Sequence, residues 1–239
     1  MPISNLQKSE NINTPTIVNS GLQLEYRFTE TTITDYSGNN RTGQSGNSSA
    51  TDSQDVTPID WLNVGVDFID DNYIACPSGI YFPGAFTVET CLFLRDYAAW
   101  ARIFDFGNGQ ANENVLLSSS NNGSGRLHLD IIANGQFSSP VVAPFSTKLL
   151  EWVYICVSFS SGTGKIYINN SLQARGNLLT PSNLTRNNNF LGRSNWNGEA
   201  YLNGCLSLFR IYNRELSNTE RTDNFKQSRL WLADKGIIL

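Results

Sequence analysis

The sequence has few charged residues, a single histidine and no cluster of basic side chains. Charged residues make up 16% of the 239 positions, and the formal net charge is −4. A protein that tracks a nucleic-acid backbone needs clustered lysine and arginine, so the composition argues against a nucleic-acid partner. Apolar runs fall short of the ~18 residues needed to cross a bilayer, which argues against a membrane span.

Two further signals are missing. The N-terminal stretch MPISNLQKSENINTPT has no apolar segment of the kind found in secretory signal peptides. The four cysteines form no CxxC pair, so a zinc site is not expected. Without a signal peptide, we expect free, buried thiols and Asn-X-Ser/Thr motifs that carry no sugar. The cysteines are Cys76, Cys91, Cys156 and Cys205.

The sequence does contain many alternating apolar segments, separated by glycine and asparagine. The clearest pair lies in residues 151–170, EWVYICVSFSSGTGKIYINN. Residues 160–164 supply turn chemistry between two runs rich in β-formers, a pattern typical of a long antiparallel hairpin. The first run is apolar on both faces, which predicts a strand in the middle of a two-layer sandwich.

Other stretches predict further strands. Residues 21–28 alternate and place Leu22, Leu24, Tyr26 and Phe28 on one inward face. Residues 61–68 alternate as well, and we expect them to pair with residues 72–76, whereas residues 41–59 predict a loop of low order. Additional strands are expected at 86–94, 100–108, 114–118 and 126–132.

Several motifs resemble those of laminin-G-like domains, which belong to the concanavalin A-like lectin/glucanase group. These motifs are the turn DYSGNN at 35–40, FTVETCLFL at 86–94, IFDFG at 103–107, GKIYINN at 164–170, FLGRS at 190–194 and YLNGCLSLFRIYNRELS at 201–217. The resemblance extends over residues 21–225, with Cys91 where the family usually has tryptophan. It implies an all-β fold, a two-sheet antiparallel jelly-roll sandwich, followed here by a short C-terminal helix.

The expected organisation is an N-terminal arm (1–20), a laminin-G-like jelly roll (21–216) and a C-terminal helix and tail (217–239). Ser217 and Glu220 have the spacing of a capping box that starts this helix, and Gly236 is a plausible C-cap. The arm is either a disordered terminus or a strap that docks on a neighbouring subunit. The tail resembles those of laminin-G-like proteins encoded by viruses and phages.

The resemblance also implies a structural Ca²⁺ site, for which Asp35 and Asn40 would supply oxygen ligands. However, Ser207 and Leu208 replace both acids that the family places in its C-terminal motif, which removes charge from the site. A turn held by hydrogen bonds alone is therefore favoured over a bound cation.

Sugar recognition needs an aromatic platform together with amide or charged groups for the hydroxyls. One loop combines Arg193, Asn195, Trp196 and Asn197 in this way, and Tyr97 with Trp100 forms a second candidate. The alternative for Trp196 is that its ring folds back onto the edge of the sandwich.

No strand carries the paired carboxylates that a glycoside hydrolase needs, and we interpret His128 as an outward strand residue. The sequence therefore predicts no enzyme but a non-catalytic jelly-roll module that binds a glycan or a partner protein surface. The alternatives are a virion structural protein that joins a homo-oligomer or larger particle, and more remotely a divergent glycoside hydrolase. Without a signal peptide, we expect it at a virion surface or in another extracellular assembly.

Overall fold

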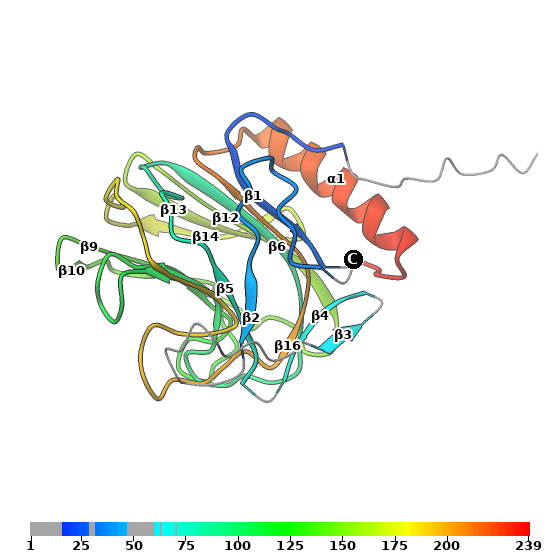
Figure 1. Ribbon diagram of the computed structural model, residues 1–239, viewed down its shortest axis with the longest axis horizontal. Coiled ribbons are helices and arrows are strands. Elements are labelled where there is room, and N and C mark those ends of the chain that lie inside the picture. The colour runs from blue at the N-terminus through cyan, green and yellow to red at the C-terminus, as the bar shows by residue number, and fades with distance from the viewer. Residues whose placement is uncertain (1–15, 29–31, 47–59, 63, 70) are drawn as a thin grey trace, which may run out of the picture.

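The computed structural model describes residues 16–28, 32–46, 60–62, 64–69 and 71–239, and these form a jelly-roll sandwich of two antiparallel sheets. Figure 1 shows the sheets facing each other, with the helix α1 on the outer side of one of them. The all-β, two-sheet fold with a short C-terminal helix that the sequence predicted is thus confirmed.

The first sheet has the strand order β14-β13-β12-β6-β16-β4-β3, and β1 pairs with the C-terminal half of β16 beside β4. Its three long central strands, β6, β12 and β16, have nine residues each. Its members are β1 (Leu22–Arg27), β3 (Asp60–Leu62), β4 (Gly65–Phe68), β6 (Phe86–Leu94), β12 (Trp152–Ser160), β13 (Thr163–Ile168), β14 (Ser171–Asn177) and β16 (Gly204–Tyr212).

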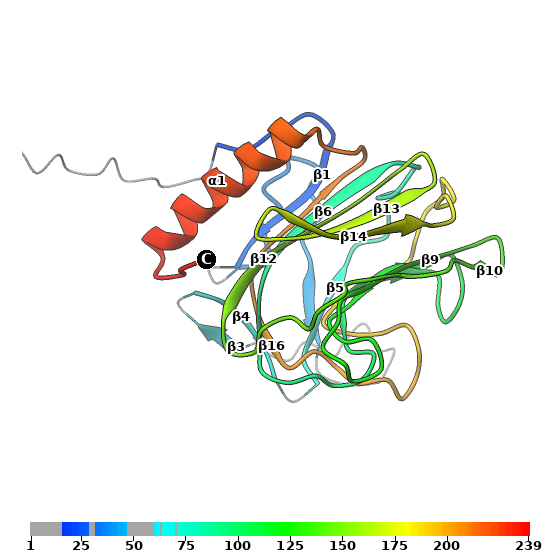
Figure 2. The same ribbon diagram turned by 180° about the vertical axis from the view of Figure 1, so that it is seen from behind.

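The second sheet has the order β10-β9-β8-β7-β15-β5-β2, with β11 paired to β9. Figure 2 shows it from behind, with β9 and β10 at the side opposite α1. Its members are β2 (Gln44–Gly46), β5 (Tyr73–Cys76), β7 (Arg102–Gly107), β8 (Val115–Ser118), β9 (His128–Ala133), β10 (Gln136–Phe137), β11 (Val141–Val142) and β15 (Asn188–Leu191).

Tight turns fix the register of the hairpins. The two residues between β12 and β13, Ser161 and Gly162, have φ of 50° and 77°. Asn169 and Asn170, between β13 and β14, have φ of 47° and 63°. Positive φ at both central residues defines a type I′ turn, whose twist matches that of the flanking strands. The hairpin predicted from residues 151–170 is confirmed.

The space between the sheets is filled by apolar side chains from the inward faces of both. Phe104 and Phe106 of β7 contact Phe209 of β16 across this space, with ring centroids 5.8 and 6.2 Å apart. Leu24, Tyr26 and Phe28 also belong to this core, as predicted. Leu22 does not, because the register of β1 shifts between Leu22 and Leu24 and turns it toward a small cluster with Tyr212 and Leu216.

The outer face of the first sheet forms a second core with α1 (Asn218–Asp234). Cys91, Tyr154 and Leu208 from three adjacent strands pack with Trp231 and Leu232 of the helix. The apolar run at 152–159 is therefore central, as predicted, but its second face is covered by a helix. Cys91, which replaces a family tryptophan, lies in the cluster that contains Trp231.

Both ends of α1 are capped by local sequence. The predicted capping box is present, with Glu220 N–H donating to the Ser217 side chain and Ser217 N–H donating to the Glu220 carboxylate. At the other end Gly236 has φ of 87°, and Ile237 N–H donates to the carbonyl of Leu232. This is a Schellman motif, in which glycine removes the steric cost of the left-handed backbone.

A charged network lies buried between α1 and the sheet. Arg210 is fully buried, and its Nε is 3.0 Å from Glu25 Oε1 while its Nη1 donates to Ser228 Oγ at 2.7 Å. Glu89 Oε2 lies 3.7 Å from Arg210 Nη1 and accepts a bond from Asn224. Burial raises the pKa of Glu89, whereas Arg210 and Arg27 outweigh burial at Glu25 and lower its pKa.

The expected pairing of residues 61–68 with 72–76 is wrong. Strand β4 pairs with β3 and β16 in the first sheet, whereas β5 pairs with β15 and β2 in the second. The chain crosses from one sheet to the other between Phe68 and Tyr73. Alternation marked both segments as strand-forming, but it did not show that residues 61–68 fold into two paired strands, β3 and β4, or that β5 lies in the other sheet. Of the expected loop at 41–59, residues 47–59 lie outside the described residues.

Substitutions at two neighbouring positions of α1 should differ strongly in their effect on stability, because only one of the two side chains packs against the first sheet. Trp231→Ala should lower the free energy of unfolding by about 3–5 kcal/mol, because it opens a cavity beneath α1. Leu230→Ala is the control, because that side chain is 50% exposed and its loss should change stability by about 0.5 kcal/mol or less. Urea denaturation followed by circular dichroism measures both, and equal losses would contradict the packing.

Replacing either buried glutamate, Glu25 or Glu89, by glutamine should change the free energy of unfolding, but with a different dependence on pH. Glu25→Gln should cost about 2–3 kcal/mol at pH 7, because it removes the carboxylate that Arg210 contacts most closely. Glu25 contributes most above its ordinary pKa of 4.5 and loses that contribution as the pH falls.

The contribution of Glu89 to stability depends on pH in the opposite direction. Its pKa is raised, so its contribution to stability is fullest below 4.5 and is lost as the pH rises. Glu89→Gln should therefore flatten the decline in unfolding free energy above that pH, while the amide still accepts the bond from Asn224. A steeper decline in this variant would show that Glu89 is stabilised as a carboxylate.

Candidate functional site

The loop that the sequence singled out follows β15 and is closed at its base. Gly192 has φ of 81°, and a Cβ there would lie 2.4 Å from the Phe68 ring, so only glycine fits. Its carbonyl accepts a bond from Leu202 N–H at 2.9 Å, and its own N–H donates to Ile103 of β7. The two ends of residues 193–201, called the rim loop below, therefore lie side by side at Gly192 and Leu202.

Asn195 fastens the middle of the rim loop to the outer face of the second sheet. Its backbone N–H and its Nδ2 each donate to the carboxylate of Asp105 at 2.9 Å, and Nδ2 also lies 3.1 Å from the carbonyl of Asn188. Asn114 supplies another bond to Asp105 at 2.8 Å. Burial raises the pKa of Asp105 despite the nearby Arg102. Asn195, a predicted ligand residue, thus has its amide nitrogen committed within the fold.

Arg102 fastens the far end of the rim loop. The guanidinium is 4% exposed, pairs with Glu199 Oε2 at 2.6 Å and donates to Ser118 Oγ at 2.7 Å. It also lies 5.3 Å from the centre of the Trp196 ring. A cation over an aromatic face is attracted by the ring electrons, so Arg102 orients the indole as well as the loop.

An open hollow of about 720 Å³ lies beside this loop. Arg193, Trp196 and Asn197 from the predicted set line it, with Trp196 half-buried and Asn197 exposed. The guanidinium of Arg193 lies 4.8 and 4.7 Å from the ring centres of Tyr73 and Phe190. The Trp196 ring therefore packs partly against the sandwich through Arg102, and its remaining surface lines the hollow.

Four polar residues from outside the segment 193–199 also line the hollow. Asp71 follows β4, Asp96 follows β6, and Tyr201 and Asn203 precede β16. Asn203 Nδ2 donates to Asp96 Oδ2 at 2.6 Å, and Arg95 N–H donates to the carbonyl of Asn203 at 3.0 Å. Tyr201 and Asn203 lie in the motif at 201–217, but no local pattern showed that these four residues meet, since long-range strand pairing brings them together.

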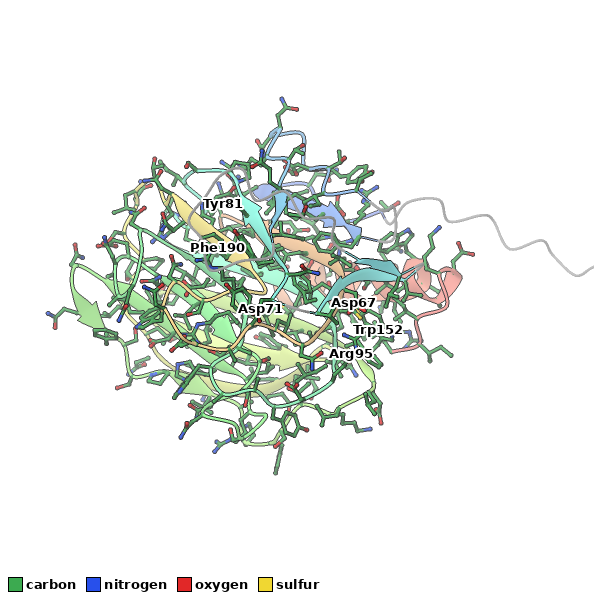
Figure 3. All side chains as sticks on the ribbon, turned by 60° about the horizontal axis from the view of Figure 1, so that its bottom comes forward. Asp67, Asp71, Tyr81, Arg95, Trp152 and Phe190 are labelled. Atoms are coloured by element: carbon green, nitrogen blue, oxygen red, sulfur yellow. The ribbon has the colours of Figure 1, made fainter. Side chains whose placement is uncertain are left out.

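Ion pairing stabilises the strand ends next to the hollow. Both terminal nitrogens of Arg95 contact the carboxylate of Asp67, at 2.6 and 2.8 Å, and one also contacts the Cys205 sulfur at 3.3 Å. Figure 3 shows Asp67 and Arg95 together and Asp71 on the segment that leaves β4. This pair connects β4, β6 and β16 at the edge from which the lining residues project.

The second predicted pair, Tyr97 and Trp100, makes other contacts. The Tyr97 ring packs over Gly125, where a Cβ would lie 2.5 Å away, and its hydroxyl donates to the carbonyl of Thr147. Trp100 has φ of 62° and contacts His128 edge to face, with centroids 5.4 Å apart. Tyr97 therefore ties neighbouring loops together, and the positive φ at Trp100 delays the start of β7 to Arg102.

The turn at 35–40 does not fit the implied Ca²⁺. Both oxygens of Asp35 accept hydrogen bonds, from the backbone N–H groups of Glu25, Ser37 and Arg41 and from Ser37 Oγ, at 2.9–3.1 Å. Asn40 has φ of 56°, as the turn requires. A cation needs a shell of oxygen acceptors, whereas this carboxylate is surrounded by donors. Within the described residues, no three His, Cys, Asp or Glu side chains gather as a metal group.

The described cysteines are all buried and free, as expected. Burial raises the pKa of Cys91 to about 12, so its thiol stays protonated at neutral pH. His128 lies 8% exposed at the start of β9, with its Nδ1 3.2 Å from Asn121 Oδ1. In the described part of the chain, no helix is long and apolar enough to cross a bilayer.

The chain belongs to the concanavalin A-like lectin/glucanases superfamily. A model of this superfamily matches residues 68–220, which is more than half of the sequence. The match spans β5 to the capping box of α1, and it confirms the resemblance seen in the motifs. No curated protein matches the chain.

Solved structures share the fold at low sequence identity. Domain 4 of AbnA, a GH43 extracellular arabinanase from Geobacillus stearothermophilus, in complex with arabinotriose, superposes with a TM-score of 0.70 at 16% identity, covering 86% of this chain and 98% of that one. The binding domain of botulinum neurotoxin DC in complex with SialylT gives 0.61 at 13% identity, covering 87% and 51%.

A structure of botulinum neurotoxin type C, whose cell entry depends on two ganglioside molecules, also gives a TM-score of 0.61 at 13% identity, covering 87% and 51%. The chain therefore spans about half the length of these toxin structures. At such identities the similarity establishes the fold.

The two asparagines of the rim loop should differ sharply in their effect on stability. Asn195→Ala should lower the free energy of unfolding by about 1–3 kcal/mol, because it strips a donor from the buried Asp105 carboxylate. Asn197→Ala is the control, since that exposed side chain should contribute less than about 0.5 kcal/mol. Chemical denaturation tests this, and equal effects would show that Asn195 does not fasten the loop.

Proposed function

We propose that this chain is a non-catalytic glycan-binding module whose ligand lies in the hollow beside the rim loop. One observation carries this proposal: the hollow combines the half-buried indole of Trp196 with Tyr201 and with carboxylate and amide groups. An indole offers a flat apolar surface to the C–H face of a sugar ring, and the polar groups bond its hydroxyls. Such a mixture is typical of ligand pockets.

The structural neighbours support the same class of ligand. One is an arabinanase domain in complex with arabinotriose, and another belongs to a toxin that interacts with gangliosides. Both of these neighbours bind carbohydrate, although the sugars differ. A glycan therefore suits this chain better than a peptide or a nucleic acid, and the rim loop is the part that would select among glycans.

Binding without hydrolysis is proposed because the acidic groups around the hollow, apart from the exposed Asp71, are engaged in structure. Asp105 is fully buried beneath Asn195, Glu199 pairs with Arg102, and Asp96 accepts bonds from Ala98 and Asn203. A glycosidase needs one carboxyl group that protonates the leaving oxygen and a second that attacks or activates water. Bound oligosaccharides should therefore stay intact on prolonged incubation.

The test is a glycan array, followed by calorimetric titration of the glycans that bind. Trp196→Ala should weaken binding roughly 30-fold, equivalent to about 2 kcal/mol, because the stacking platform is lost. Phe145→Ala is the matched control, because this aromatic side chain is 74% exposed in a separate groove and should be dispensable.

Two results would overturn the proposal. Unchanged binding by Trp196→Ala would place the ligand elsewhere on the sandwich. A blank array, with native mass showing a large particle, would favour the second candidate, a structural subunit of a virion or similar assembly. That candidate has its own observation: Phe145, Leu150 and Ile238 are 74%, 65% and 84% exposed around one groove, as at contact surfaces between proteins.

A further inference from the structure

The charges that line the hollow are unbalanced. Asp71, Asp96 and Glu199 contribute three carboxylates to the lining, whereas Arg193 contributes one guanidinium. Sequence spacing does not predict this concentration, because the three acids lie 25 and 103 positions apart along the chain. They meet because the ends of β4 and β6 and the rim loop share one edge of the sandwich.

The positive groups at the hollow are already used by the fold. Arg193 is 9% exposed, and its guanidinium stacks on the rings of Tyr73 and Phe190. Arg102, behind Trp196, is 4% exposed and shares its charge between Glu199 and Asp105. Neither guanidinium presents the open fork that would receive a carboxylate or sulfate group of a ligand in two parallel bonds.

The carboxylates, in contrast, retain the capacity to accept bonds from a ligand. Asp71 is exposed, and each oxygen of Asp96 accepts one bond, from Ala98 N–H at 3.0 Å and from Asn203 Nδ2 at 2.6 Å. A carboxylate has about four acceptor positions, so sugar hydroxyl groups could add further bonds. Hydroxyl donors are favoured here, whereas a second anion would face like charge.

We infer that the hollow takes neutral glycans and rejects those that carry a carboxylate or a sulfate group. This inference rests on the proposed function and narrows its ligand class. The carboxylates of Asp71 and Asp96, within several ångströms of a bound anion in a partly solvated site, correspond to a preference of at least about tenfold for the neutral form.

The experiment uses an array on which each neutral oligosaccharide stands beside its sialylated and sulfated derivatives. The neutral member of each bound pair should bind at least about tenfold more tightly at low salt, and the difference should shrink at 0.5 M NaCl because exposed charges are screened. Asp71→Asn should reduce the discrimination. Asp223→Asn, which removes an exposed charge on α1 at the other sheet, should leave it unchanged.

The outcomes separate this inference from the proposed function. If charged derivatives bind as tightly as their neutral partners, and Trp196→Ala still weakens binding, the inference fails while the function stands. Equal discrimination by wild type and Asp71→Asn, with no dependence on salt, would also overturn it. If no glycan of either kind binds, the proposed function fails, and the inference fails with it.

Discussion

A strand that is apolar on both faces must be covered twice, and this requirement shapes the whole molecule. Strands β6, β12 and β16 are buried along nearly their full length. The second sheet covers one face, and α1 covers the other through Trp231 and Leu232. The helix is therefore an integral third layer, and its capping box and Schellman motif matter because they define where that layer begins and ends.

The third layer also explains the buried charges. Arg210 lies on the helix-facing side of β16, where it is sealed from water and must find partners. Glu25 from β1, Glu89 from β6 and Ser228 from α1 surround it, so one guanidinium connects two neighbouring strands and the helix. Removing one partner of a buried pair costs more than the pair gains by forming, so the network favours this docking over alternatives.

Features set by neighbouring residues could be predicted, whereas those set by distant pairing could not. Gly162 and Asn169 marked turns, and Ser217 marked the helix start, because each acts on backbone groups a few residues away. The sequence predicted a strand over 100–108, which contains Asp105, but not the rim loop that buries this carboxylate. Nothing near Asp71 or Asp96 in the sequence shows that they face Trp196, because that arrangement depends on the order of strands in two sheets.

At the rim loop, one side chain, Arg102, both orients the Trp196 ring and balances nearby negative charge. Arg102 lies over Trp196 and also neutralises Glu199 and Asp105, so its one positive charge serves two acids. A loop fastened in this way loses little conformational freedom when a ligand arrives, which favours binding. Because Arg102 is engaged with Trp196 and Glu199, its charge is not available to a ligand. The carboxylates of Asp71 and Asp96 therefore determine the electrostatic field in the hollow.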